Sequence, residues 1–416
     1  MMETSSLEFK RELSDSFLKT VCAFANRDGG RVVFGVDDDG RPVGVDDPSA
    51  CALAVENKIN DGVKPRPDFS LAIDETSRTV TLTIEPGRRT PYYFRSKTYK
   101  RSGTSTVEVD ALELSRLILA GQNRSYEELR ASSQDLSFST LESHLKEAAG
   151  IERLTLDTLK TLQLYSDADG YSNAGALLAD ANPFCGIDAV RFAENPNILL
   201  DRRSFAGLSV LEQYHRCVEM YRTYYCYERI DGIERTPVQL VPEEALREAV
   251  ANALVHRTWD VEAPIKVSMH PDRIEVASPG GLPSGISERE YLRGQVSILR
   301  NPILGNVFFR LGLIERFGTG VMRINDAYAN SGRKPRFEVF ENSLLVVLPL
   351  ATPRADLAGD AAAVYDLLRA RGELSSAQVA AATGFGRTKT ARLLGELVAQ
   401  GFIKKRGETR ARRYFL

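Results

Sequence analysis

Residues 375–401, SSAQVAAATGFGRTKTARLLGELVAQG, decide the fold of the C-terminal part of the chain. Ser375 stands where a cap precedes a run of helix-forming residues, and Gly384 ends that run. After a tight glycine-containing turn, apolar residues recur at helical spacing up to Gly401. The stretch therefore predicts two helices, over 377–383 and 387–400, joined by a short turn.

The flanking residues complete a small domain. Upstream, residues 361–371 carry an apolar stripe that a glycine stops, which predicts a further helix. Downstream, residues 402–403 and 413–415 predict two short strands around a turn at 404–409. The core stripe of the last helix is expected to consist of Ala391, Leu394, Leu397 and Val398. Three helices followed by a β-hairpin predict a winged helix-turn-helix.

Cationic residues gather on two parts of this module. The first residues of a recognition helix meet base edges in the major groove. A basic hairpin suits the phosphate backbone, because each neutralised phosphate releases a counterion. The predicted DNA contacts are therefore Arg387, Thr388, Lys389, Thr390 and Arg392 on the helix, and Lys404, Lys405, Arg406, Arg410, Arg412 and Arg413 on the hairpin. The alternative is a solvated basic tail on a small helical domain.

Composition limits the class of protein. A chain of 416 residues exceeds one ordinary core, so several domains are expected. Hydrophobic residues at 43% and charged residues at 26% are typical of a globular chain, and apolar runs such as 344–350 are too short for a membrane span. The polar start, residues 1–10, is unlike a signal peptide. We therefore expect a cytoplasmic protein without membrane contact.

Cysteine and histidine usage limits the cofactors. The five cysteines are scattered without a CxxC pair, which argues against a disulfide framework and fits a reducing compartment. The four histidines lie far apart, with no Cys or carboxylate cluster at zinc spacing. We therefore expect no zinc, and neither haem nor flavin.

The first part of the chain combines an acidic start with a glycine-flanked strand. Its pattern predicts a helix over 17–26, a strand over 31–36, an acidic turn over 37–40 and a strand over 79–84. The motifs are Glu3-Thr-Ser-Ser-Leu-Glu8-Phe-Lys10, Ala23-Phe-Ala-Asn26, Gly29-Gly-Arg-Val-Val-Phe-Gly-Val-Asp37 with Gly40, and Val43-Gly-Val45. Together they resemble the Schlafen AlbA-type domain over about the first 115 residues. The resemblance implies an α+β fold that binds nucleic acid, including RNA or single strands.

That resemblance also implies a catalytic carboxylate trio, known from ribonuclease members, at Glu3, Glu8 and Asp37. Three carboxylates around one divalent metal can orient water and stabilise charge on a phosphodiester. Spacing alone does not show that they converge. The alternative is that Glu8 is a surface acid and Asp37 belongs to an acidic turn.

The middle of the chain contains a helix and two glycine motifs in a fixed order. Residues 242–257 predict a helix with a proline near its start and acids in its first turn, and Glu248 and Asn252 share one of its faces. A strand over 273–277 leads into Ser278-Pro-Gly280-Gly281, and Gly318-Thr-Gly320 follows. This order resembles the divergent ATPase module of the gyrase, heat-shock-ninety and histidine-kinase class (GHKL), an α/β sandwich. The module often follows an AlbA-type domain in bacterial transcriptional regulators.

The resemblance implies roles for these residues. Glu248 would polarise water, and Asn252 would help to hold the magnesium of ATP. Ser278 stands near the place of the aspartate that recognises adenine, and a hydroxyl lacks that charge-assisted acceptor. Backbone would approach the nucleotide at Gly280, Gly281, Gly318 and Gly320. The alternative is a remnant fold that serves as a spacer or dimer platform, with Glu248 in a surface ion pair.

The expected organisation is an α+β multidomain chain: an AlbA/Schlafen-like domain at 1–118, a GHKL-like domain at 137–350 and a winged helix-turn-helix at 359–416, with linkers at 119–136 and 351–359. The leading hypothesis is a regulator of transcription that binds double-stranded DNA and responds to a ligand or nucleotide. A homodimer is expected for two-fold sites. A metal-dependent nuclease and an ATP-driven switch are the alternatives, so enzyme activity stays open. Tyr221, Tyr224, Tyr225 and Tyr227, at helical spacing, are interpreted as a core or interface stripe.

Overall fold

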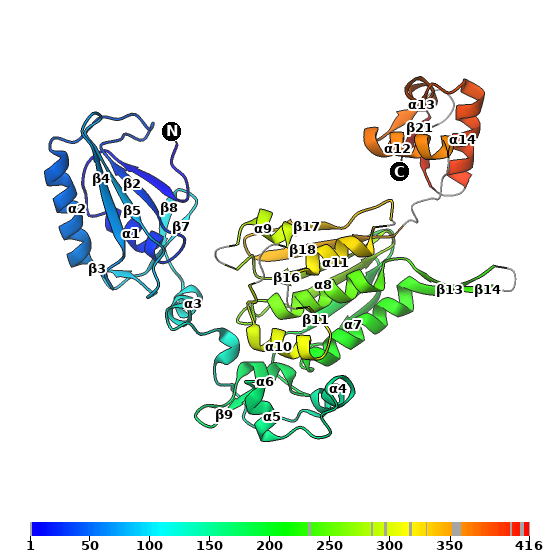
Figure 1. Cartoon of the computed structure of the whole chain (residues 1–416), viewed down its shortest axis with the longest axis horizontal. Coiled ribbons are helices and arrows are strands. Elements are labelled where there is room, and N and C mark those ends of the chain that lie inside the picture. Colours follow the sequence, from blue (N-terminus) through cyan, green and yellow to red (C-terminus); the bar gives the residue numbers. More distant parts are fainter. Residues whose placement is uncertain are drawn as a thin grey trace.

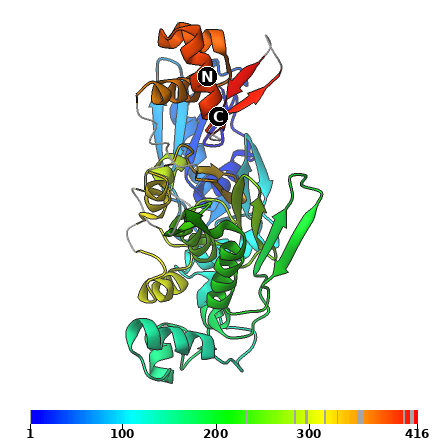
Figure 2. The same cartoon turned by 90° about the vertical axis from the view of Figure 1, so that its right-hand side faces the viewer.

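The computed structural model describes residues 2–231, 234–283, 286–294, 298–315, 318–329, 331–351, 359–399, 402–407 and 412–415. Helices and sheets alternate in an N-terminal part, a large central part and a small C-terminal part (Figures 1 and 2). The expected α+β multidomain class is confirmed. Among the described residues, no helix combines the length and apolar composition that a bilayer span requires.

The N-terminal part is built on a four-stranded sheet in the order β1-β2-β5-β4. β1 runs parallel to β2, and the other neighbours are antiparallel. Phe17, Phe24 and Phe34 belong to the buried core between the sheet and its helices. The strands are β1 (Leu7–Lys10), β2 (Gly30–Phe34), β4 (Phe69–Asp74) and β5 (Thr79–Ile84); the helices are α1 (Phe17–Ala25) and α2 (Pro48–Gly62).

Shorter elements complete this part. They are β3 (Val63–Lys64) paired with β6 (Tyr93–Phe94), β7 (Tyr99–Ser102) paired with β8 (Ser105–Glu108), and α3 (Ala111–Gly121). Asp110 caps α3, because its side chain accepts a hydrogen bond from the backbone of Glu113.

The segment predicted as a polar linker, 119–136, is partly ordered against the central part. α3 extends to Gly121, and a 3-10 turn, η1 (Tyr126–Glu128), follows. The Glu127 side chain is fully buried, and its two oxygens accept hydrogen bonds from the backbone N–H groups of Ile303 (2.6 Å) and Leu304 (2.9 Å). These donors belong to the first turn of a helix, where an acid is favourable. The linker prediction is therefore wrong for residues 126–128.

A six-stranded sheet forms the central part, in the order β12-β11-β15-β16-β18-β17. β11 and β15 are parallel, and all other neighbours are antiparallel. The strands are β11 (Ile187–Phe192), β12 (Leu199–Ser204), β15 (Ile265–His270), β16 (Arg273–Pro279), β17 (Arg336–Val339) and β18 (Ser343–Pro349). The strand predicted at 273–277 is confirmed as β16.

One layer of helices packs on this sheet, with α8 against β16 and β18 (Figure 1). The layer consists of α7 (Val210–Tyr225), α8 (Glu243–His256), α10 (Pro302–Arg310) and α11 (Gly320–Ala327), with α9 (Glu288–Arg293) beside it. A helical segment precedes it: α4 (Ser139–Ala149), α5 (Leu156–Thr161), β9 (Tyr165–Ser166), β10 (Gly170–Tyr171) and α6 (Asn173–Leu178). A two-stranded ribbon of β13 (Cys226–Asp231) and β14 (Glu234–Gln239) connects α7 to α8.

The C-terminal part has the predicted helix order. It contains α12 (Asp360–Arg371), β19 (Leu374–Ser375), α13 (Ser376–Thr383), α14 (Arg387–Ala399), β20 (Lys404–Arg406) and β21 (Arg413–Phe415), with the strands in the order β19-β21-β20. Ser375 and Gln378 form a capping box at the start of α13.

Three details of this part differ from the prediction. The first hairpin strand is β20 rather than 402–403, because Ile403 is buried in the core and the chain pairs only beyond it. β19 adds a third strand that was not predicted. Ala391 is exposed, and Leu393 is buried in its place. The linker predicted at 351–359 lies outside the described residues over 352–358.

Candidate nucleic-acid interface and ligand pocket

The start of α14 presents two exposed residues from the set predicted to contact DNA. Arg387 is the first residue of the helix and Thr388 the second, and both are exposed. Arg387 has no acidic partner among the described residues. Its guanidinium is therefore available for a base edge or a phosphate, as expected for the first turn of a recognition helix.

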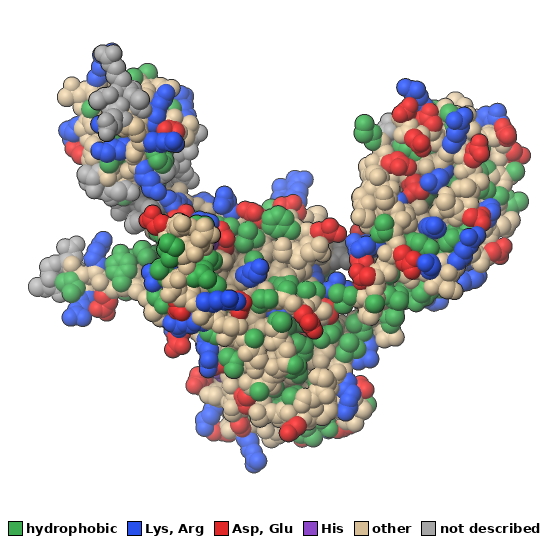
Figure 3. Space-filling model, turned by 180° about the vertical axis from the view of Figure 1, so that it is seen from behind, with side chains coloured by type: hydrophobic (Ala, Val, Ile, Leu, Met, Phe, Trp, Pro, Cys, Tyr) green, Lys and Arg blue, Asp and Glu red, His purple; other side chains and the backbone are tan. Residues whose placement is uncertain are grey.

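The hairpin strand β20 carries a second group of unengaged cations. Lys404, Lys405 and Arg406 are exposed, and the described part of the chain offers them no ion-pair partner. Basic side chains are visible over this module in the space-filling view (Figure 3). Such a strand has the charge that a phosphate backbone attracts.

Other predicted DNA contacts are engaged within the module. Lys389 forms an ion pair with Asp360 and stands over the Phe385 ring. Arg392 pairs with Glu396 at 2.9 Å. Arg413 donates to Gln378 of the capping box at 2.6 Å. These three side chains are exposed, but each would have to leave its present partner in order to contact DNA.

Two predicted contacts need correction or lie outside the described chain. Thr390 is fully buried, and its hydroxyl donates to the backbone oxygen of Gly386 at 3.1 Å. The prediction that Thr390 faces DNA is therefore wrong, since the helix turns this position toward the core. Arg412 is only half-buried. Arg410 lies outside the described residues.

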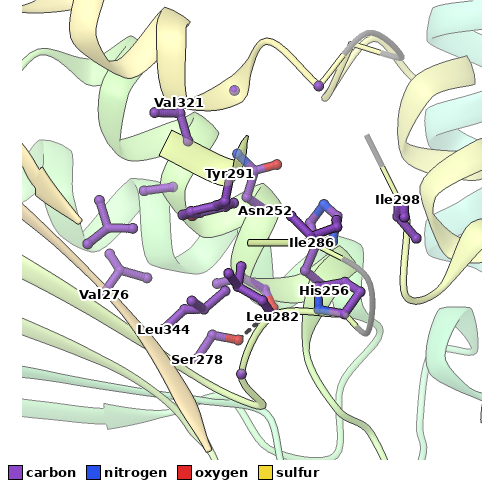
Figure 4. A pocket seen from close by; sticks show the side chains of 17 residues that line it. Asn252, His256, Val276, Ser278, Leu282, Ile286, Tyr291, Ile298, Val321 and Leu344 are labelled. Atoms are coloured by element: carbon purple, nitrogen blue, oxygen red, sulfur yellow. Dashed lines mark hydrogen bonds between the residues drawn. The ribbon is translucent and has the colours of Figure 1, made fainter. Parts of the chain in front are cut away.

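A pocket lies between α8, the end of β16, β18 and the start of α11, with an empty volume of about 840 Å³ that opens to solvent. Five of the seven residues predicted for nucleotide binding line it: Asn252, Ser278, Gly281, Gly318 and Gly320. Glu248 and Gly280 adjoin it. Figure 4 shows the side chains that surround this space.

Glu248, Asn252 and Gly320 form the polar corner of the pocket. The amide of Asn252 donates to Glu248 Oε1 at 3.1 Å. A Cβ at Gly320 would lie 2.5 Å from Asn252 Nδ2 and 2.6 Å from Glu248 Oε1, so a larger residue at this position would displace these two side chains. Burial raises the pKa of Glu248, and Arg323, 3.8 Å away, opposes that rise. Glu248 and Asn252, which are four positions apart in the sequence, are thus hydrogen-bonded on one face of α8.

Ser278 occupies the floor of the pocket at the end of β16. Its hydroxyl donates to the backbone oxygen of Ala253 in α8 at 3.1 Å (Figure 4). Because the proton is used in this way, the oxygen can present a lone pair to the pocket. A neutral acceptor of this kind can take a hydrogen bond from an amino group, but more weakly than a carboxylate.

The Gly280–Gly281 turn is shaped by packing. Gly280 has a φ of +103°, and a Cβ there would lie 1.9 Å from Thr258 Oγ1. A Cβ at Gly281 would lie 2.3 Å from the backbone oxygen of Glu341. Arg300 clamps the turn, since its guanidinium donates to Thr258 and, at 2.6 Å, to the oxygen of Gly281. Both glycines are therefore required by the fold itself.

The apolar wall and one histidine were not predicted as site residues. Leu282, Ile286, Tyr291 and Ile298 line the pocket from segments that lie far along the chain from α8. No spacing pattern links them to Asn252. His256 also lines the pocket, and burial, together with Arg300, lowers its pKa to about 4. The imidazole is therefore neutral at physiological pH.

The three carboxylates predicted as a nuclease centre do not converge. Glu8 is buried; it pairs with Arg101 and, at 2.7 Å, with Lys10, and Thr20 donates to both of its oxygens. Glu3 accepts from the backbone of Phe9 at 2.8 Å. Asp37 accepts from the backbone N–H groups of residues 39 and 41 in an exposed turn. Within the described ranges, no three His, Cys, Asp or Glu side chains are grouped as a metal site would need.

Family models match three separate stretches of the chain. The model described as "Schlafen, AlbA_2" matches residues 3–110. The model HATPase_c_4, described as the C-terminal part of the ATP-dependent DNA helicase RecG, matches residues 262–348. The "IclR helix-turn-helix domain" matches residues 361–407. The second match contains Ser278 and the glycine turns, while the helix with Glu248 and Asn252 precedes it.

Solved structures give a weaker likeness. The DIP2311 protein from Corynebacterium diphtheriae is 21% identical over 99% of this chain and 92% of its own, with a TM-score of 0.49. The N-terminal domain of a RecG-related protein from Nitrosomonas europaea is 26% identical over 24% of this chain and 78% of its own, with a TM-score of 0.19. No curated protein matches the chain.

The three matched models follow one another in the order that the sequence motifs predicted. Each coincides with one of the structural parts described above: the β1-β2-β5-β4 sheet, the second half of the central sheet, and the helices around α14. The chain therefore combines an N-terminal Schlafen AlbA_2 domain, an ATPase-like domain of the RecG C-terminal type and a C-terminal helix-turn-helix domain.

Proposed function

We propose that the protein is a transcriptional regulator that binds double-stranded DNA through α14 and β20. The observation that carries this proposal is the set of exposed cations without an ion-pair partner in the described chain: Arg387 at the start of the recognition helix, and Lys404, Lys405 and Arg406 on the wing. A helix-turn-helix domain points to DNA binding in general. Sequence-selective duplex binding by a homodimer is the finer proposal, because two-fold sites require two copies.

The central pocket is proposed as the site of a small effector. Asn252, Ser278 and the close approach at Gly320 fit an adenine nucleotide, with Asn252 Oδ1 as the side-chain oxygen that would help hold its magnesium ion. The bound nucleotide would supply charge and shape to the pocket. Neutral His256 and the apolar wall would hold its flat part, and Glu248 would orient water near the polar corner. The N-terminal domain is proposed to add contacts to nucleic acid, including RNA or single strands.

The DNA-binding proposal is tested by selecting bound genomic fragments with the full-length protein and measuring affinity by fluorescence anisotropy. Arg387→Ala is expected to weaken specific binding roughly five- to hundredfold, as removal of one base-reading side chain does. Arg216→Ala is the matched control, because this exposed arginine lies on α7 of the central part, where it pairs with Glu212, and its loss should leave affinity unchanged. The triple change Lys404→Ala, Lys405→Ala and Arg406→Ala should reduce the salt dependence by about 0.9 for each phosphate that is no longer neutralised. Unchanged affinity and salt slope in both variants would refute the proposal.

A metal-dependent nuclease is not favoured by the geometry. Glu8 is held by two cations and a hydroxyl inside the fold, and Asp37 closes a turn. Both oxygens of Glu8 would have to give up a partner to bind a metal, whereas Asp37 uses Oδ1 for its turn contacts.

A further inference from the structure

The ribbon formed by β13 and β14, here called the arm, is an unusual surface feature. Helix α7 runs directly into β13, and only residues 240–242 separate β14 from α8. Six paired positions, from Cys226 opposite Gln239 to Asp231 opposite Glu234, make a regular antiparallel ribbon. The arm stands away from the body in Figures 1 and 2. It is therefore rooted firmly between two core helices while its strands project outward.

The arm exposes large apolar side chains. Ile230 is 65% exposed and Tyr227 51% exposed, and among the described large hydrophobic residues only Met2 is more exposed than Ile230. Apolar side chains along the arm are visible in Figure 3. An isolated two-stranded ribbon is at best marginally stable in water. A ribbon that exposes isoleucine and tyrosine is therefore expected to be covered in the working assembly.

An open sheet edge lies next to the root of the arm. β12 ends the six-stranded sheet, and no described strand pairs with its outer side. Ile198, Leu199 and Leu200, at the start of this strand, are each about half exposed. The Tyr224 hydroxyl, in the last turn of α7, donates to Asp201 of β12 at 2.8 Å. The open edge and the arm thus neighbour each other, yet they are not paired within one copy.

The two surfaces match in apolar character, whereas their arginines are largely paired within one copy. On the arm, Arg235 pairs with Glu228 at 3.3 Å. On β12, Arg203 pairs with Asp201 at 2.9 Å, and Arg202 pairs with Asp188 of β11 at 3.2 Å. The contact that both surfaces offer is therefore apolar, with Tyr227 and Ile230 on the arm and Leu199 and Leu200 on the edge.

We propose that two copies of this chain associate by exchanging arms, each arm lying along the open β12 edge of the other copy. An unpaired edge has free N–H and C=O groups that accept an added strand. A second copy satisfies both surfaces at once, because a two-fold axis uses each arm and each edge reciprocally. The inference rests on the proposed function, since it names the partner that a two-fold DNA site requires. Because the arm leads directly into α8, this dimer contact would also adjoin the helix that lines the pocket.

The test is sedimentation velocity on the full-length protein without DNA. The unaltered chain is expected to be a dimer at micromolar concentration. Ile230→Asp and Leu200→Arg should each produce a monomer, because they place charge into the exchanged contact. Leu53→Asp is the matched control, since Leu53 is 61% exposed on α2, away from both surfaces, and should leave the dimer intact. Equal circular dichroism spectra and melting temperatures will show that the variants fold.

A second measurement locates the contact. Ile230→Cys and Leu200→Cys are prepared separately, mixed and oxidised, and the cross-linked peptides are identified by mass spectrometry. A 230–200 disulfide that forms only in the mixture supports the exchange. A monomeric unaltered chain, a dimer that both charged variants retain, or cross-links confined to 230–230 would overturn it. Binding of monomeric Ile230→Asp to a half-site separates this outcome from failure of the DNA-binding proposal.

Discussion

The guanidinium of Arg116 and the carboxylate of Asp260 form a two-pronged ion pair, with Nε donating to Oδ2 at 2.6 Å and Nη2 donating to Oδ1 at 2.9 Å. Arg116 belongs to α3, at the end of the N-terminal part, and Asp260 to the loop after α8. Two residues before Asp260, Thr258 accepts from Arg300, which also clamps the oxygen of Gly281 in the pocket wall. The junction between the first two domains is therefore connected to the ligand pocket through a short chain of polar contacts.

Loss of this ion pair should loosen the pocket wall. Arg116→Ala and Asp260→Asn are each expected to increase hydrogen exchange in peptides that contain residues 258–264 and 278–283, because Asp260 loses its partner and no longer anchors the loop that holds Thr258. Exchange is measured by mass spectrometry on the full-length protein. Arg27→Ala is the control. Arg27 pairs with Glu113, which lies on α3 as Arg116 does, but among the described residues Arg27 forms no ion pair with the central domain. Unchanged exchange in both variants would show that the junction and the pocket are independent.

Gly320→Ala should disturb the polar corner while preserving the fold. The new methyl would meet only the ends of two side chains, Asn252 and Glu248, which can move aside at small cost, so the free energy of unfolding should change by about 1 kcal/mol or less. If the pocket takes a nucleotide, magnesium-ATP should raise the melting temperature of the unaltered protein but not of this variant. Gly395→Ala is the control, because a Cβ there meets nothing within 4 Å. A flat response of the unaltered protein to both ATP and adenosine would contradict the nucleotide assignment and leave DNA binding untouched.

Glu8→Gln should destabilise the N-terminal domain strongly. It leaves the nearly buried guanidinium of Arg101 without its carboxylate, and breaking a buried pair in this way costs about 3–5 kcal/mol. Urea denaturation gives the change in unfolding free energy. Glu108→Gln, which breaks the exposed pair with Lys97, should cost less than about 1 kcal/mol.

The same variant bears on nuclease activity. Incubated with manganese and labelled RNA or single-stranded DNA, the unaltered protein is expected to give no product. Product formation that a folded Glu8→Gln protein has lost would restore the carboxylate trio as a catalytic centre.

Glu127 should make stability depend on pH. Burial raises the pKa of Glu127 from 4.5 to about 7, against the lowering effect of the two backbone donors. The folded state therefore binds a proton more tightly than the unfolded state, so this group's contribution to stability is greatest below pH 4.5 and is lost as pH rises through about 7. This difference in pKa between the folded and unfolded states corresponds to at most about 3 kcal/mol of stability.

The measurement compares unfolding free energies of the unaltered protein and Glu127→Gln between pH 4.5 and 8. The excess stability of the unaltered protein should fall with rising pH and level off above about 7. The comparison between the two proteins is needed because His256, with its pKa lowered to about 4, has the opposite effect on the protein's stability. Its contribution to the free energy of unfolding is lost as pH falls. A constant difference across this range would contradict the raised pKa of Glu127.

Local sequence patterns determined the elements that depend on local forces. Capping residues, terminating glycines and apolar periodicity predicted α13 and α14, and the spacing of four placed Glu248 and Asn252 on one face of α8. These features could be read from the chain because hydrogen bonds within a helix and residues a few positions apart define them. The first two domains were predicted from the resemblance of short motifs to known families, not from local forces.

Contacts between distant segments could only be decided by the tertiary structure. Tyr227 follows Tyr224 at the helical spacing of three in sequence, yet the helix ends at Tyr225 and Tyr227 lies exposed on the arm. Thr390 turns inward, and Glu8 is neutralised by Arg101, which lies 93 positions away. Whether a charged or polar side chain is free to act depends on which groups the fold brings against it, and no spacing along the chain contains that information.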